Sequence, residues 1–276
     1  MFKARAITGA TMIFGVLCLA YFSSNIVALV IFTVILFLSA LEWGAVSGLK
    51  SFQERLLFSV IVVGISLLVV YAPSFINGIS TANILGTVFT LIWIAIACWV
   101  VSYQKTGAPV LRNGFGLCCL GVAVLVPFFV SIIFVWNKDP IHFLALILVV
   151  SSVDSFAYFG GKKWGRLKFV KKVSPAKTWV GVFAGVFGAL LVGNIIYFIS
   201  DDIFSTKLLF IWNLILIATI LAAILGDLLE SLLKRFGNIK SSGVVLPGHG
   251  GLLDRIDSLC AAAPMFFLFN YIFFGP

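Results

Sequence analysis

Residues 214–226 read LILIATILAAILG and are followed directly by Asp227. An uncharged run of this kind forms most of a membrane-spanning helix, which needs about 20 mainly apolar residues. The whole chain has the same character, because 62% of its 276 residues are hydrophobic, 11% are charged and its mean hydropathy is +1.17. Soluble domains carry roughly 25% charged residues. The sequence therefore predicts an integral membrane protein.

Comparable apolar runs lie on both sides of this stretch. Because lipid offers no hydrogen-bond partners to an exposed backbone, each run is expected to be a helix. We predict an all-α polytopic membrane protein with about nine transmembrane helices, the first of them retained as a span and not cleaved as a signal peptide. We assign residues 1–114 to N-terminal membrane helices and residues 115–276 to a C-terminal catalytic membrane region. The nine runs lie near residues 5–22, 26–41, 56–72, 84–101, 115–136, 141–158, 179–199, 208–227 and 259–275.

The formal net charge of +9 arises from basic residues that lie between the apolar runs. Nucleic-acid-binding proteins instead carry such residues along a helix face or an aromatic-studded strand, so we expect membrane lipid or an anionic substrate as the partner and no nucleic acid. Basic loops stay in the cytoplasm. With a cytoplasmic N-terminus, nine alternating spans place every Lys and Arg except Lys138 and Lys207 on the cytoplasmic side. We therefore predict a cytoplasmic N-terminus.

Polar residues concentrate in residues 226–258, GDLLESLLKRFGNIKSSGVVLPGHGGLLDRIDS. On a helix that continues from the apolar run, Asp227, Ser231 and Lys234 share one face because they stand at i, i+4 and i+7. Asp254 lies where the last apolar run begins. The glycines between these positions indicate a tight loop whose backbone can approach a ligand.

Asp227 is the first functional candidate. A carboxylate that directly follows an apolar run is costly in a membrane unless it faces protein, water or a cation. Mg2+ takes oxygen ligands, commonly one or two carboxylates together with substrate phosphates. Asp227 and Asp254, each at the membrane end of its run, could be that pair of carboxylates. The alternative is a solvated loop with ordinary ion pairs.

A second polar segment spans residues 160–181, GGKKWGRLKFVKKVSPAKTWVG, and contains no acid. Ser174-Pro175, followed by Lys177 directly before an apolar run, predicts a helix start, where free N–H groups together with lysine and hydroxyl donors favour phosphate. An electrostatic anchor to anionic lipid is the alternative.

Two further polar residues have weaker patterns. Asp154 lies near a membrane end, where it is either a ligand-site residue or an ion-pair partner for a lysine of the adjoining loop. His249 stands alone in a glycine turn and lacks the spacing of a metal site.

These segments resemble the CDP-diacylglycerol synthases, also called phosphatidate cytidylyltransferases. The resemblance rests on SLLKRFGNIKSSGVVLPGHGGLLDRID at residues 231–257, and on LGDLLES, KVSPAKTWVG, VDSFAYFGG and EWGAVSG, the last of which begins at Glu42. It implies transfer of a cytidylyl group from CTP to phosphatidic acid, which gives CDP-diacylglycerol and pyrophosphate. It also implies a requirement for Mg2+, alone or with a second cation, and a homodimer.

The resemblance also implies roles for individual residues. Asp227 and Asp254 correspond to metal-site carboxylates and, with Lys234 and Arg235, to catalytic residues. The implied substrate-binding residues are Ser174, Lys177, Ser231 and Lys240. We add His249, Arg255, Asp257 and Asp154 as further substrate-binding candidates. At Ser241 the chain departs from the family, which usually has an aspartate there, and we interpret that aspartate as auxiliary.

Both implied substrates are polyanions, which suggests a mechanism. We expect the phosphatidate oxygen to attack the α-phosphorus of CTP in line, with a metal and basic residues screening the charge. No general base is needed, because the attacking phosphate is largely ionised near neutral pH. The short chain is typical of a bacterial inner membrane, with the active site facing the cytoplasm.

Three other functions compete with this interpretation. A transporter or channel would carry polar residues at the midplane of several spans, and spans one to five contain almost none. A polyprenol kinase using CTP would share acidic and basic residues without the whole HGGLLDRID run. A structural membrane subunit would leave Asp227 and the glycine loop without a role.

Overall fold

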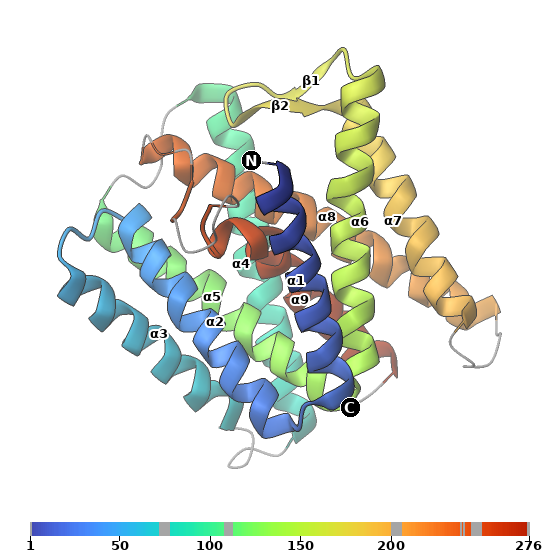
Figure 1. The fold of residues 1–276 in the computed structure, drawn as a ribbon, viewed down its shortest axis with the longest axis horizontal. Helices are drawn as coiled ribbons and strands as arrows, with labels where there is room; N and C mark the ends of the chain where they lie inside the picture. The colour runs from blue at the N-terminus through green and yellow to red at the C-terminus, as the bar shows by residue number, and fades with distance from the viewer. Residues whose placement is uncertain are drawn as a thin grey trace. The chain divides into compact units, whose positions relative to one another are not determined.

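In the computed structural model of the protein, the described residues are 2–71, 78–107, 113–199, 206–237, 239, 241–243 and 250–274. They form nine α-helices and one antiparallel β-hairpin, coloured in chain order in Figure 1. The elements are α1 (Phe2–Phe22), α2 (Asn25–Val46), α3 (Phe52–Tyr71), α4 (Gly78–Thr106), α5 (Gly114–Lys138), α6 (Pro140–Trp164), β1 (Lys168–Val170), β2 (Ser174–Thr178), α7 (Trp179–Ile199), α8 (Thr206–Phe236) and α9 (Leu253–Phe274).

The helical architecture confirms the predicted all-α polytopic class. Each of the nine apolar runs falls on one helix, as far as its residues are described. Among the described residues, seven helices could cross a membrane by length and composition: α2, α3, α4 over Gly86–Thr106, α5, α6, α7 and α8 over Leu208–Phe236. In α1 the apolar part is shorter, Ile13–Phe22. The first turns of α9 contain Asp254, Arg255 and Asp257, which lower its mean hydropathy.

Packing divides the chain into two compact units. The first comprises residues 1–81, 111–144 and 233–257, and the second comprises residues 82–110, 145–232 and 258–276. Each unit therefore combines segments from both halves of the sequence.

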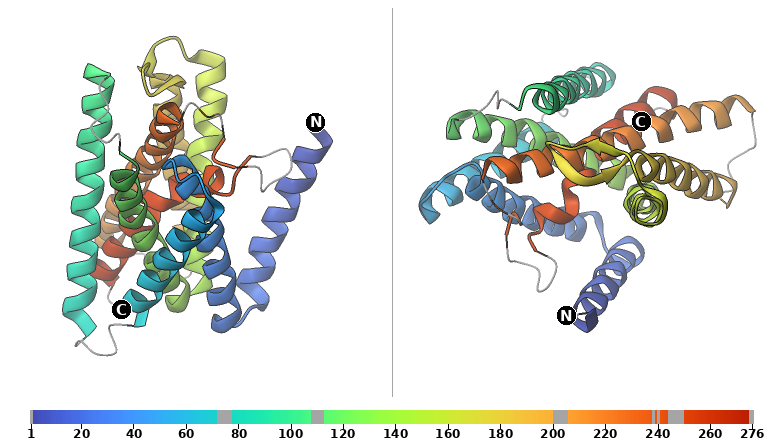
Figure 2. Two further views of the ribbon diagram at one scale, coloured as in Figure 1. Left: turned by 90° about the vertical axis from the view of Figure 1, so that its left-hand side faces the viewer. Right: turned by 90° about the horizontal axis from the view of Figure 1, so that it is seen from above.

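In the first unit, α2, α3 and α5 pack against one another, and α2 and α3 run side by side in Figures 1 and 2. Trp43 on α2 donates a hydrogen bond of 2.9 Å from Nε1 to the carbonyl oxygen of Leu117 on α5. Gly121, one turn further along α5, permits this approach, since a Cβ there would lie 2.5 Å from Trp43 Nε1. The contact joins α2 to α5 within the first unit.

In the second unit, α7 packs closely against α6 and α8. A Cβ at Gly185 on α7 would lie only 2.8 Å from the carbonyl oxygen of Val153 on α6. On the other side, Asn194 on α7 and Asn213 on α8 exchange side-chain amide hydrogen bonds of 3.0 and 3.1 Å. This exchange satisfies amide groups that lipid tails could not.

The chain between α6 and α7 forms the β1–β2 hairpin, which lies at one end of these two helices in Figures 1 and 2. The predicted helix start at Ser174-Pro175 is therefore wrong. Both strands of a two-stranded sheet are edge strands, which are the strands in which a sheet tolerates proline. Helix α7 begins only at Trp179, and Thr178 is its N-cap residue, because Thr178 Oγ1 accepts a hydrogen bond of 3.2 Å from the Gly181 N–H.

The tip of the hairpin is fastened to the last turn of α4 by one residue. The N–H of Lys172 donates a hydrogen bond of 2.9 Å to Gln104 Oε1, and Lys172 Nζ donates one of 2.7 Å to the carbonyl oxygen of Lys105. Because Lys177 lies on β2 of the same hairpin, these bonds restrict the position of a predicted substrate-binding residue.

Candidate active site

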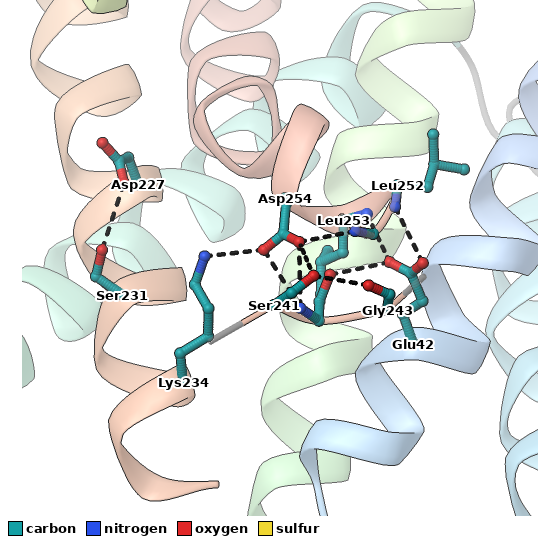
Figure 3. A network of polar contacts seen from close by, with 11 residues as sticks. Glu42, Asp227, Ser231, Lys234, Ser241, Gly243, Leu252, Leu253 and Asp254 are labelled. Atoms are coloured by element: carbon teal, nitrogen blue, oxygen red, sulfur yellow. Dashed lines mark hydrogen bonds and ion pairs between the residues drawn. The ribbon is translucent and has the colours of Figure 1, made fainter. Parts of the chain in front are cut away.

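Asp254 lies in the first turn of α9 and accepts hydrogen bonds from four residues (Figure 3). Lys234 Nζ, from the last turn of α8, lies 2.8 Å from Oδ1. Ser241 Oγ and the Gly251 N–H each lie 2.8 Å from Oδ2, and the Ser242 N–H lies 3.2 to 3.3 Å from both oxygens. These five residues are called the Asp254 cluster. The Asp254 side chain is only 10% exposed, so one cation and three polar donors offset the cost of burying its carboxylate.

Gly250 allows the loop to reach this carboxylate. Its φ of +85° is in the left-handed region that favours glycine. A Cβ at this position would also lie 2.7 Å from Asp254 Oδ2 and 2.6 Å from Ser241 Oγ. The predicted tight loop is thus present in its described part, residues 241–243 and 250–252. Its Gly250 makes room for the carboxylate of Asp254.

Ser241 stands where the family resemblance implies an aspartate. Its Oγ lies 2.8 Å from Asp254 Oδ2 and 2.7 Å from the carbonyl oxygen of Gly243. The hydroxyl group has a single hydrogen, which it donates to one of these acceptors at a time. A neutral donor therefore faces Asp254 here, where an aspartate would add a second carboxylate.

Asp227 forms the centre of a second group, in the second unit. It forms an ion pair with Lys177 of β2, and Ser231 Oγ, one turn further along α8, lies 3.4 Å from its Oδ1. The side chains of Lys177 and Asp227 are 22% and 26% exposed, more than that of Asp254. Asp227, Lys177 and Ser231 are called the Asp227 cluster.

A cavity of about 360 Å3 opens beside the Asp227 cluster. It lies within the second unit, and α6, the hairpin, α7 and α8 all contribute to its wall. Its charged lining residues are Asp154, Lys162, Lys168, Lys177 and Asp227. Three lysines and two aspartates give the wall a net positive charge, which suits an anionic ligand.

The remaining predicted site residues lie on several elements. Ser174 is half-buried on β2, and Arg235 is exposed in the last turn of α8. On α9, Arg255 is exposed and Asp257 is half-buried. Lys240 and His249 lie outside the described residues.

The structure thus brings several predicted residues together in two groups. Lys234 contacts Asp254, and Ser231 and Lys177 contact Asp227. Asp154 joins the second group as a lining residue of the same cavity. Helix α8 contributes to both groups, with Asp227 and Ser231 in one and Lys234 in the other.

Comparison with known proteins assigns a family to this arrangement. A sequence model described as the cytidylyltransferase family matches residues 3–273. The chain belongs to the cytidylyltransferase family. It is 30% identical to the phosphatidate cytidylyltransferase of Haemophilus influenzae, with 98% of this chain and 99% of the relative covered. It is 35% identical to that of Rickettsia bellii over 74% of this chain and 88% of the relative, and 28% identical to that of Pseudomonas aeruginosa over 83% and 82%. The family resemblance inferred from the motifs is confirmed.

Sequence reasoning assigned no role to Glu42, which the structure brings against the loop of the Asp254 cluster. Its carboxylate accepts hydrogen bonds from Ser242 Oγ at 3.0 Å, from the Leu252 N–H at 3.0 Å and from the Leu253 N–H at 2.8 Å (Figure 3). Glu42 is 6% exposed. An acid within the apolar sequence SALEWGAV is the same signal that singled out Asp227, so this residue could have been found.

Two cavity residues were also missed. Lys162 and Lys168 line the cavity with Lys177, although only the last was singled out from the sequence. Seven basic residues lie close together in this segment, and the end of α6 together with the hairpin decides which of them face the cavity.

Proposed function

We propose that this chain transfers the cytidylyl group of CTP to phosphatidic acid, giving CDP-diacylglycerol and pyrophosphate. The observation that carries the proposal is the lysine-lined cavity beside Asp227 in a chain whose relatives are named phosphatidate cytidylyltransferases. Both substrates carry several negative charges, and lysines at the wall of a cavity offset the repulsion between them.

The lysines would hold the phosphate groups. Lys162, Lys168 and Lys177 would bind phosphate oxygens in the cavity, because a lysine ammonium is a compact donor with three N–H groups. Lys177 would exchange Asp227 for a phosphate when substrate enters. Lys234 would remain paired with Asp254 or turn its ammonium toward a phosphate. In-line attack by the phosphatidate oxygen then needs no general base, because this oxygen is already ionised near neutral pH.

Mg2+ is proposed as the cofactor, and the donor atoms of the two aspartates fit it. Mg2+ prefers oxygen ligands and commonly uses one or two carboxylates with substrate phosphates. Asp227 is the more open of the two, while both oxygens of Asp254 already accept hydrogen bonds. Among the described residues, no three His, Cys, Asp or Glu side chains gather to form a protein-only metal site. Asp227 in its cluster and Asp254 in its own are the two candidate ligands, and a bound ion would supply charge neutralisation at the phosphates.

The location is also part of the proposal. The relatives come from bacteria, which supports an inner membrane as the site of action. A cytoplasmic N-terminus and a cytoplasmic active site are proposed, and the distribution of basic residues supports them. A homodimer is proposed from the family resemblance, and light scattering of the detergent-solubilised protein would measure it.

The test is turnover by the purified full-length chain given CTP, Mg2+ and phosphatidate. We expect CDP-diacylglycerol and pyrophosphate in equal amounts. Asp227→Asn and Asp254→Asn should each lower kcat by about 100-fold or more, as expected when a charge that stabilises the transition state is lost.

Asp139→Asn is the matched control. Asp139 also accepts a backbone N–H at the start of a helix, from Ile141 at 2.8 Å, but it lies between α5 and α6 and outside both clusters. Its variant should keep full activity. Unchanged turnover in both cluster variants would remove the site assignment, and absence of product from the unmodified chain would remove the proposed function.

A further inference from the structure

Glu42 reaches the same loop as Asp254 but from a different helix. It belongs to α2, and its three hydrogen-bond partners lie 200 to 211 residues later in the chain. Two of the donors are the N–H groups of Leu252 and Leu253, at the start of α9. The first N–H groups of a helix have no partner within it, and its N-terminus attracts carboxylates. Glu42 therefore supplies from α2 the acceptor that the start of α9 needs.

Ser242 links Glu42 to Asp254. Its Oγ donates to Glu42 Oε2 at 3.0 Å, while its N–H lies 3.2 to 3.3 Å from the carboxylate oxygens of Asp254. Leu253, the residue directly before Asp254, donates its N–H to Glu42 as well. Glu42 thus fixes one residue on each side of the Asp254 carboxylate: Ser242 in the loop and Leu253 on the helix.

Two glycines make this link possible. A Cβ at Gly251 would lie 2.5 Å from Glu42 Oε2, and a Cβ at Gly243 would lie 2.7 Å from Glu42 Cδ. Contacts under 3.0 Å of this kind would force the carboxylate or the loop to move. The Glu42 side chain therefore occupies the space that side chains at positions 243 and 251 would fill.

Burial makes the arrangement sensitive to change. Glu42 is 6% exposed, so any donor that lost its acceptor would find little water to replace it. Leaving a buried donor without a partner costs more than the hydrogen bond itself contributes. If the side chain at position 42 no longer accepted these hydrogen bonds, the loop would move so that its donors could find other partners. Asp254 would move with the loop.

We propose that Glu42 is a positioning residue for cytidylyl transfer, which orients Asp254 through Ser242 and the first turn of α9. The inference rests on the proposed role of Asp254. Glu42 is not proposed to touch either substrate. Its effect is on the geometry of the Asp254 carboxylate and hence on kcat.

Glu42→Gln is the decisive variant, because it keeps the size of the side chain and replaces one acceptor oxygen with an NH2 donor that faces N–H groups. We expect kcat to fall by at least about tenfold, as for a lost hydrogen bond to a charged group. The KM for CTP should change by less than about threefold. Ser242→Ala removes one of the three donors, and it should lower kcat by a smaller factor. It also keeps the proposal testable if Glu42→Gln does not fold.

A double variant separates positioning from general stabilisation. If Glu42 acts through Ser242, then Glu42→Gln combined with Ser242→Ala should lose little more activity than Glu42→Gln alone. If the kcat losses of the two single variants multiply in the double variant, the proposal is contradicted.

Two control variants complete the test. Trp43→Phe removes the neighbouring buried bond to Leu117, and it should lower the thermal unfolding temperature without lowering kcat. Glu54→Gln changes an exposed glutamate that accepts the Ser51 N–H at 3.2 Å, and it should change neither property strongly. Equal kcat losses in Trp43→Phe and Glu42→Gln would show a structural role only and overturn the inference. A normal Glu42→Gln beside an inactive Asp254→Asn would overturn this inference alone, whereas a fully active Asp254→Asn would overturn the site assignment.

Discussion

Gly250 holds the backbone of the Asp254 cluster in a conformation that other residues rarely adopt. Its φ is +85°, and the space next to its Cα is occupied by Ser241 Oγ and Asp254 Oδ2. A side chain there would meet both a strained backbone and two polar atoms. The glycine is therefore needed to bring the loop against Asp254.

Gly250→Ala should lower both activity and stability. Backbone strain of this kind costs about 1 to 3 kcal/mol, and displacement of Asp254 should reduce kcat by about tenfold or more. Turnover and thermal unfolding in detergent would measure the two effects. Gly64→Ala in α3 is the control, because a Cβ there meets no atom within 4 Å and alanine favours helix. A Gly250→Ala protein as active as Gly64→Ala would show that the loop tolerates a side chain.

The sequence identified Asp227 and Asp254 but not Glu42. All three are acids at the boundary of apolar runs, where a carboxylate needs a partner. For the two aspartates, neighbouring polar residues in the same segment drew attention to the site. The partners of Glu42 are 200 or more residues away in the chain, so the sequence could single out this acid but not the tertiary contact that gives it a role.

At the scale of elements, the hairpin differs most from the sequence-based prediction. A Ser-Pro pair before an apolar run is a helix-start signal, but here pairing of residues 168–170 with residues 174–178 places it in a strand. Helices α6 and α8 likewise continue beyond their apolar runs, to Trp164 and Phe236. Apolar composition locates the part of a helix that lies in lipid, whereas its polar ends are decided by capping and contacts.

Gln104→Ala should loosen the hairpin, because it removes the acceptor of the Lys172 N–H. We expect trypsin to cleave after Lys171 or Lys172 several times faster, since exposed segments are cleaved through local opening. The KM for CTP should also rise by about two- to tenfold, because β2 carries Lys177 to the cavity. Gln53→Ala, at an exposed position on α3, should leave both quantities unchanged. The same cleavage rate in both variants would contradict a fastening role for Gln104.

For the whole molecule, composition predicted most of the architecture. Lipid leaves the backbone one way to satisfy its hydrogen bonds within a single segment, so apolar runs become helices with few alternatives. Packing into two units could not be predicted in this way. Each unit combines distant segments, such as residues 1–81 with residues 233–257, and depends on contacts such as Trp43 with the carbonyl of Leu117.

The proposed orientation predicts which residues an impermeant maleimide can reach. In a cysteine-free version of the chain, Lys171→Cys should be protected in intact cells and labelled after the membrane is opened. Asn137→Cys, in the exposed last turn of α5, should be labelled in intact cells once the outer membrane is permeabilised. Mass shift on a gel would report both. The reverse pattern would place the basic segments, and with them the proposed site, outside the cytoplasm.

The contact between Glu42 and residues 242–253 also has a consequence during synthesis. Translation proceeds at about 5 to 20 residues per second, so roughly 10 to 40 seconds separate the emergence of Glu42 from that of its partners. During this interval the Glu42 carboxylate on α2 lacks the donors that it contacts in the folded protein. Only a nearly complete chain supplies the hydroxyl of Ser242 and the N–H groups of Leu252 and Leu253. The start of α9 must therefore be synthesised before Glu42 on α2 can take its final position.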